Sequence, residues 1–112
     1  MAAGSGCGGG SGSSKRTPTG RDIAVIGASV SDVVYQCQSA AAGFIAGPDR
    51  AAVKRDVDRL VALLSQVELD ARFRFTGRPE PTTLRAQAEQ ATRSLRADCA
   101  PEQARRLAEA LG

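Results

Sequence analysis

The stretch TGRDIAVIGASVSDVVYQCQ, residues 19–38, decides the fold class. Its large apolar side chains recur three and four positions apart, which places them on one face of an α-helix. Thr19 and Asp22 have the spacing of a capping box, so we expect the helix to begin near Gly20. The predicted apolar face consists of Ile23, Ile26, Val30, Val33, Cys37, Ala41 and Phe44, with Val34 and Ile45 beside them.

The first helix is expected to end at Gly47 and Pro48, and a second helix to begin there. Glycine tolerates the left-handed backbone that closes a helix, and proline fits the first position of the next one. Asp49 suits the positive end of that helix dipole. The apolar positions of the second helix are Val53, Val57, Leu60, Leu64, Val67 and Ala71. Asp56 and Asp58 are two positions apart, and we expect both on the solvated surface.

Two further helices are expected after residues 72–81, a segment rich in glycine and proline that no helix interior accepts. The third has the apolar positions Leu84, Ala88, Ala91 and Leu95, with Cys99 next in step. Pro101 starts a short fourth helix with the apolar positions Ala104, Leu107 and Leu111. The sequence therefore predicts an all-α fold: a small antiparallel bundle of three long helices and a short C-terminal helix, residues 21–112. Neither a membrane-spanning segment nor a β fold is expected.

The first 20 residues are predicted to form a disordered leader. They are rich in glycine and serine and hold almost no large apolar side chain, so nothing offsets the entropy cost of ordering them. The chain has 15 Lys and Arg against 12 Asp and Glu, and two of the cations, Lys15 and Arg16, lie in the leader. The helical body is thus nearly neutral, and its charge does not favour a nucleic-acid partner.

Cys37 and Cys99 each continue an apolar face on helices that the bundle brings together. They are either small buried side chains that stay reduced, or a disulfide that stabilises the fold. The sequence leaves both alternatives open. The chain has no histidine and no CxxC spacing, so no metal site is expected.

The third cysteine, Cys7, lies in the segment AAGSGCGGGSGSS, residues 2–14. This segment resembles the region around the lipidated cysteine of bacterial lipoproteins, with a small residue, Gly6, before the cysteine and a glycine/serine tether after it. Gly4 stands where that family has an aliphatic residue, and a signal peptide encoded upstream of Met1 is expected. The resemblance implies a lipid on Cys7, through which alone the chain would contact a membrane, and a location in the cell envelope. An oxidising compartment of this kind would favour a disulfide between the other two cysteines.

One segment alternates cations and rings, a composition used to stack bases or hold phosphates. Alternatively, the rings cover the open end of the bundle while the arginines stay in water. The candidate interaction residues are Arg72, Phe73, Arg74, Phe75 and Arg78.

We do not expect an enzyme, because no nucleophile has a histidine or another evident base beside it. The stretch GGGSGSSKRT lacks the residue order of a phosphate-binding loop, and no cofactor or small-molecule substrate is evident. The main hypothesis is a structural or interaction module of the cell envelope, or a secreted one, with an unidentified protein partner. The alternative is a cytoplasmic helical interaction protein that touches nucleic acid weakly through residues 72–78.

Overall fold

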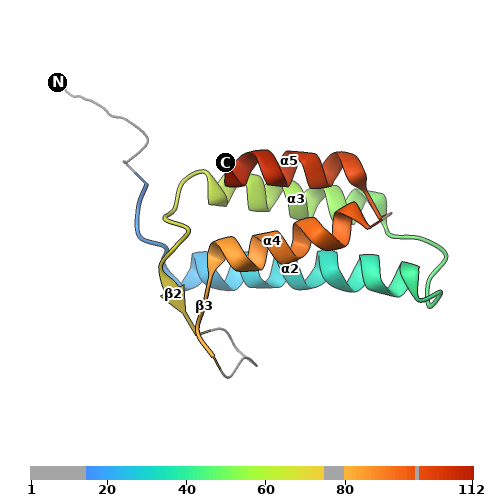
Figure 1. Ribbon diagram of the computed structural model, residues 1–112, viewed down its shortest axis with the longest axis horizontal. Helices are drawn as coiled ribbons and strands as arrows, with labels where there is room; N and C mark the ends of the chain where they lie inside the picture. The colour runs from blue at the N-terminus through green and yellow to red at the C-terminus, as the bar shows by residue number, and fades with distance from the viewer. Residues whose placement is uncertain (1–14, 75–79, 98) are drawn as a thin grey trace.

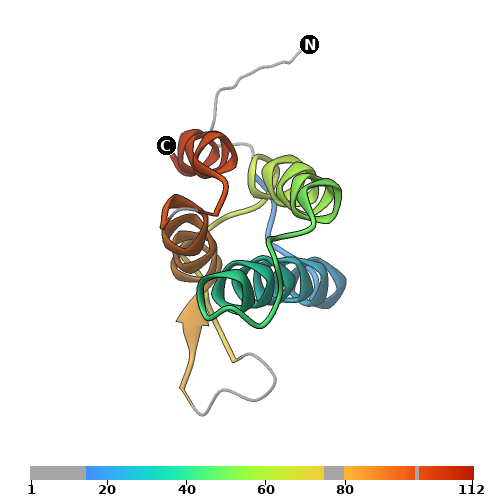
Figure 2. The same cartoon turned by 90° about the vertical axis from the view of Figure 1, so that its right-hand side faces the viewer.

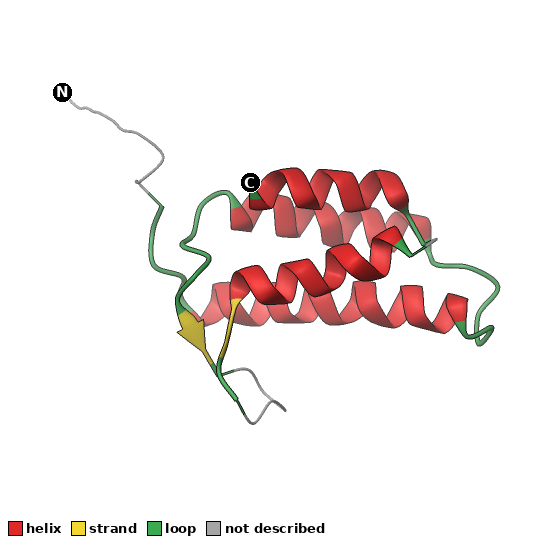
Figure 3. Ribbon diagram, in the orientation of Figure 1, coloured by secondary structure: helices red, strands yellow, loops and turns green. Residues whose placement is uncertain are grey.

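The computed structural model describes residues 15–74, 80–97 and 99–112, and within them the chain forms four α-helices (Figure 1). These are α2 (Gly20–Ala41), α3 (Arg50–Leu64), α4 (Leu84–Arg96) and α5 (Pro101–Leu111). Two short strands, β2 (Arg72–Phe73) and β3 (Thr82–Thr83), lie between α3 and α4 (Figure 3). The predicted all-α fold class is confirmed. No helix in the described part of the chain is long and apolar enough to cross a membrane.

The four helices pack around one core in the order α2, α3, α5, α4, as the end-on view of Figure 2 shows. The helix pairs α2/α3 and α4/α5 are antiparallel, as predicted. However, α2 and α4 run in the same direction and lie side by side, because the segment between α3 and α4 crosses the end of the bundle (Figure 1). This crossing brings the C-terminal part of α2 close to the turn that joins α4 to α5.

The core consists largely of the predicted apolar positions. All four helices contribute to one cluster of buried side chains, in agreement with the helical periodicity. The fully buried large side chains are Ile26, Val33, Val53, Val57, Leu60, Leu64, Val67, Leu84, Leu95 and Leu107.

The predicted start of the first helix is confirmed in detail. Thr19 is the N-cap of α2, and its hydroxyl accepts a hydrogen bond from the Asp22 amide at 3.1 Å. The Asp22 carboxylate in turn accepts from the Thr19 amide at 2.8 Å. Two amides that the helix itself leaves unpaired are thereby satisfied.

The predicted end of the first helix is wrong by several residues. α2 ends at Ala41, and Gly43 takes the left-handed conformation at φ 82°. The amides of Gly43 and Phe44 donate to the carbonyls of Ala40 and Ser39 at 3.2 and 2.9 Å, which is the Schellman pattern of helix termination. Gly43 therefore stops the helix before the pattern reaches Phe44, whose side chain is exposed instead of buried.

The second helix also differs at both ends. Asp49 is the N-cap of α3 and accepts from the Ala52 amide at 3.1 Å, so Pro48 precedes the cap instead of occupying the first turn. The helix ends at Leu64, well before Ala71, which is exposed. Val67 is buried as predicted, although it lies outside the helix.

Residues 15–19 contact the helical body, although the predicted leader extends to residue 20. The Arg16 amide donates to the Gln66 carbonyl at 3.0 Å, and the Arg16 carbonyl accepts from the Glu68 amide at 2.9 Å. Pro18 is buried. These contacts fix the chain beside the residues that follow α3. The rest of the predicted leader, residues 1–14, lies outside the described residues.

Candidate functional site

The clearest chemical feature is a disulfide between Cys37, in the second half of α2, and Cys99, in the turn between α4 and α5. The Cα atoms of the two cysteines are 5.3 Å apart, well within the range that a disulfide spans. Both side chains are buried against the core. The predicted approach of these residues is confirmed, and it results from the parallel packing of α2 beside α4.

This disulfide links parts of the chain that are 62 positions apart. Around Cys99 the backbone is already tied to α4, because the amides of Cys99 and Ala100 both donate to the Leu95 carbonyl, at 3.3 and 2.9 Å. The bond therefore joins two ordered elements and holds the α4/α5 pair against α2.

A carboxyl pair, the buried Asp56 on α3 and the half-buried Asp32 on α2, is the main feature that sequence reasoning missed. The residue Asp56 is only 7% exposed, so its predicted place on the solvated surface is wrong. The Asp32 carboxyl of α2 is near enough to act on the pKa of Asp56 across the helix interface. The signal was present in the spacing, since Asp56 lies three residues after Val53 and four before Leu60, both core residues.

The surroundings of Asp56 favour its protonated form. Burial is the largest cause and raises the pKa of Asp56 to about 7, and the nearby Asp32 carboxyl acts in the same direction. Arg59, whose Nη1 is 3.6 Å from Asp56 Oδ1, and Arg55 oppose this effect. Within the described residues, Asp56 Oδ2 is buried without a hydrogen-bond partner. A carboxyl group that holds a proton near neutral pH is thus built into the interface between α2 and α3.

The ion pairs of Asp58 and Asp22 are of the ordinary kind. Asp58 accepts from Lys54 at 3.0 Å and from Arg106 of α5 at 2.6 Å, and these hydrogen bonds, that of Arg106 first, lower the pKa of Asp58. Arg16 pairs with Asp22, and this hydrogen bond is the main cause that lowers the pKa of Asp22. The Arg106–Asp58 and Arg16–Asp22 pairs each join two segments of the fold, whereas Lys54 lies on the same helix as Asp58. Neither carboxylate is poised to take up a proton near neutral pH.

The described part of the predicted interaction segment, residues 72–74, begins with strand β2, which lies with β3 at one end of the bundle (Figure 1). Strands β2 and β3 are antiparallel, with Arg72 opposite Thr83 and Phe73 opposite Thr82. Arg72 and Arg74 are exposed, whereas Phe73 is half-buried and lies outside the hydrophobic core. Phe75 and Arg78 lie outside the described residues. Pairing between β2 and β3 was not expected, because the glycine and proline residues between the two strands indicated only a loop.

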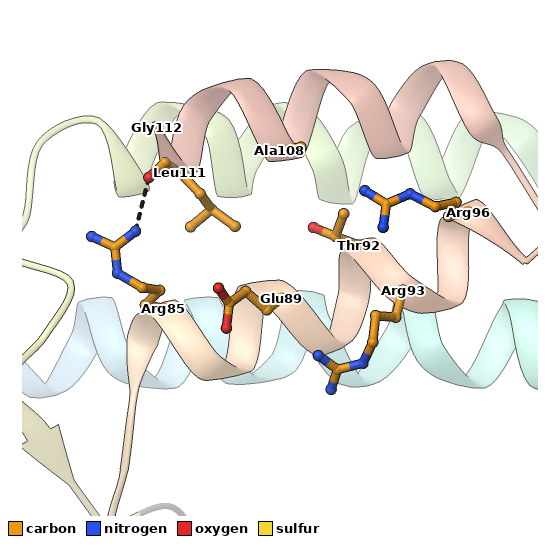
Figure 4. A pocket seen from close by; sticks show the side chains of 8 residues that line it. All are labelled: Arg85, Glu89, Thr92, Arg93, Arg96, Ala108, Leu111 and Gly112. Atoms are coloured by element: carbon orange, nitrogen blue, oxygen red, sulfur yellow. Dashed lines mark hydrogen bonds between the residues drawn. The ribbon is translucent and has the colours of Figure 1, made fainter.

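A shallow groove of about 480 Å³ runs between α4 and α5 (Figure 4). Its side chains include Arg85, Arg93, Arg96 and Glu89. The Arg85 guanidinium donates to the Leu111 carbonyl at 2.8 Å and to the Asp70 carboxylate at 2.8 Å, so it braces the end of α5. Arg93 and Arg96 point in different directions in Figure 4, and the three guanidinium groups do not converge on one anion.

The remaining candidate residues give no further site. Cys7 lies outside the described residues. The hydroxyl group of Ser29 could have served as a nucleophile, but it is buried inside α2, where no substrate reaches it, and it has no hydrogen-bond partner among the residues the structure describes. In the same part of the chain, no group of three or more acidic or cysteine side chains is placed to hold a metal ion.

Comparisons with known proteins add no relative: no family model, no curated protein and no solved structure matches this chain.

Proposed function

We propose that this chain is a small structural or interaction module of the cell envelope or the extracellular space, without catalytic activity. The observation that carries the proposal is the disulfide between Cys37 and Cys99. Disulfides form and persist in oxidising compartments and are rare in the reducing cytosol.

The small size of the domain supports the same conclusion, because it limits the stability that the core can provide. A domain of this size buries a modest core, and small exported domains commonly compensate with disulfides. Here the bond closes a long loop and joins α2 to the α4/α5 pair, where a cross-link restricts the unfolded chain strongly.

The segment around Cys7 supplies the mode of attachment. Its resemblance to the lipidated region of bacterial lipoproteins supports a lipid on Cys7, with the following glycine and serine residues as a tether. In this arrangement the bundle is held near a membrane surface and binds a protein partner there, while no helix enters the bilayer.

The test is to express the chain with its natural upstream sequence in a bacterial host and to separate membrane, exported and cytosolic fractions. We expect the protein in the membrane fraction, a lipid mass on the Cys7 peptide, and release from the membrane in the Cys7→Ser variant. A secreted protein without the lipid would support export alone. Protein confined to the cytosol, with an unmodified Cys7, would contradict the proposal and support the cytoplasmic alternative.

A further inference from the structure

Two aromatic side chains stand in solvent at the C-terminal end of α2. Tyr35 is 64% exposed and Phe44 is 84% exposed, and they are the exposed large hydrophobic residues of the described part of the chain. Together with Gln38, Ser39 and Ala42 they line a hollow of about 390 Å³. We call these five residues the aromatic surface. Exposed apolar patches of this kind mark interaction sites on soluble proteins.

The Phe44 ring is held out by an ordered turn. In a Schellman motif the residue after the left-handed glycine usually packs against apolar residues in the last turn of the helix. In this chain those positions are the polar residues Gln38 and Ser39, while the hydrogen bond from the Phe44 amide to the Ser39 carbonyl fixes the backbone. The backbone that carries the ring therefore has a fixed position, and a partner that buries the ring would not have to order this part of the chain.

The surface is also free of charge. A second hollow of about 270 Å³ adjoins the first, shares Tyr35 and Gln38 with it, and extends toward α4. No residue that lines either hollow is charged, although 24% of the chain is Asp, Glu, Lys or Arg. Such a surface gives an acidic or basic partner nothing to pair with, but it meets its own copy without repulsion.

The polar groups on this surface suit self-pairing as well. The Tyr35 hydroxyl and the Gln38 amide both donate and accept hydrogen bonds, so the same groups can pair across a twofold axis. An aromatic side chain has roughly 200 Å² to bury, so the two rings offer about 300 Å² per copy and about 600 Å² in a dimer. This is about half of the roughly 1,200 Å² that a stable interface needs. Val34, Gln38 and Ala42 lie beside the rings and would add to the area that a dimer buries.

We propose that the aromatic surface is the interface of a symmetric homodimer, so that the partner it binds is a second copy of this chain. The inference rests on the proposed function in one respect, because it names a partner for the interaction module. It does not depend on the compartment, since the surface lies outside the disulfide and the leader.

Analytical ultracentrifugation of the full oxidised chain, from roughly 10 to 500 µM, tests this inference. We expect a monomer–dimer equilibrium for the wild type. Phe44→Lys would place two like charges in the interface and weaken dimerisation by at least about 30-fold, as expected for a central aromatic anchor. Because the Phe44 side chain is 84% exposed, the variant should fold with an unchanged melting temperature. Ala46→Lys is the matched control, since it adds the same charge to an exposed position of the same loop outside the hollows.

Tyr35→Ala is a second variant and should also weaken the dimer. A wild-type chain that stays monomeric over the whole range would overturn the inference, as would equal dimerisation by Phe44→Lys and Ala46→Lys. A failure of the proposed function is distinguishable, because it would appear in cell fractionation and would leave the ultracentrifugation result unaffected.

Discussion

Replacement of Asp56 by asparagine tests the role of this buried carboxyl group most sharply, because its effect depends on pH. The folded state raises the pKa of Asp56 from the ordinary value of 3.8 to about 7. The folded protein therefore binds this proton more tightly than the unfolded chain does, and unfolding releases it between about pH 4 and 7. The stabilisation from this group is complete below that window and is lost as the pH rises through it.

The size of the effect follows from the shift in the pKa of Asp56. A shift of about three pKa units corresponds to an upper limit of about 4 kcal/mol, at 1.36 kcal/mol per unit. Arg59 lies close enough to stabilise the charged form, and solvent reaches part of the site, so we expect about 2 kcal/mol. Asparagine keeps the shape of the side chain and a hydrogen-bond donor but cannot become charged. The variant should therefore not lose this stability as the pH rises.

Urea unfolding followed by circular dichroism at several pH values is the assay. The free energy of unfolding of Asp56→Asn should be close to that of the wild type near about pH 4 and should exceed it by about 2 kcal/mol near about pH 8. Glu109→Gln, at an exposed position, is the control and should follow the wild-type curve. A wild-type stability that does not fall between these pH values, or an asparagine variant that is less stable at the higher pH, would refute the reasoning.

Three further changes test other parts of the fold. Replacement of both Cys37 and Cys99 by alanine should lower the free energy of unfolding by about 4 kcal/mol, since the bond closes a loop of 62 residues. Thermal unfolding of the wild type with and without reductant measures the same effect, and an equal melting temperature in the two conditions would contradict it. Thr19→Ala removes the cap of α2 and should cost about 1 kcal/mol in urea unfolding, whereas Thr17→Ala, at an exposed position just before the helix, should cost almost nothing. Leu60→Ala creates a cavity in the core and should cost about 2–5 kcal/mol, so a loss below about 1 kcal/mol would show that α3 is not packed as described.

The sequence predicted those parts of the fold that depend on local pattern. The apolar faces, the Thr19 cap and the start of the last helix at Pro101 follow from helical period and capping chemistry, and the structure has all of them. The end of α2 was misplaced because Gly47 with Pro48 is a stronger signal than Gly43, while the helix ends just before Gly43, which takes the left-handed conformation.

Features that depend on contacts between distant segments were harder to predict. The burial of Asp56 requires knowledge of which face of α3 meets α2, and the short parallel contact of Arg16 with Val67 joins segments that have no pattern in common. The disulfide is an intermediate case. The apolar period placed Cys37 and Cys99 on the inside, but only the parallel packing of α2 and α4 brings their Cα atoms to 5.3 Å.

The most direct test of the central claim is the state of the cysteines in protein taken from its native cells. Free thiols are blocked on lysis without reductant, and the peptides are then mapped by mass spectrometry. The account predicts that the peptides of Cys37 and Cys99 are cross-linked to each other and carry no blocking group, and that reduction lowers the melting temperature by several degrees. Full alkylation of both residues in the native protein would contradict the disulfide and, with it, the exported module.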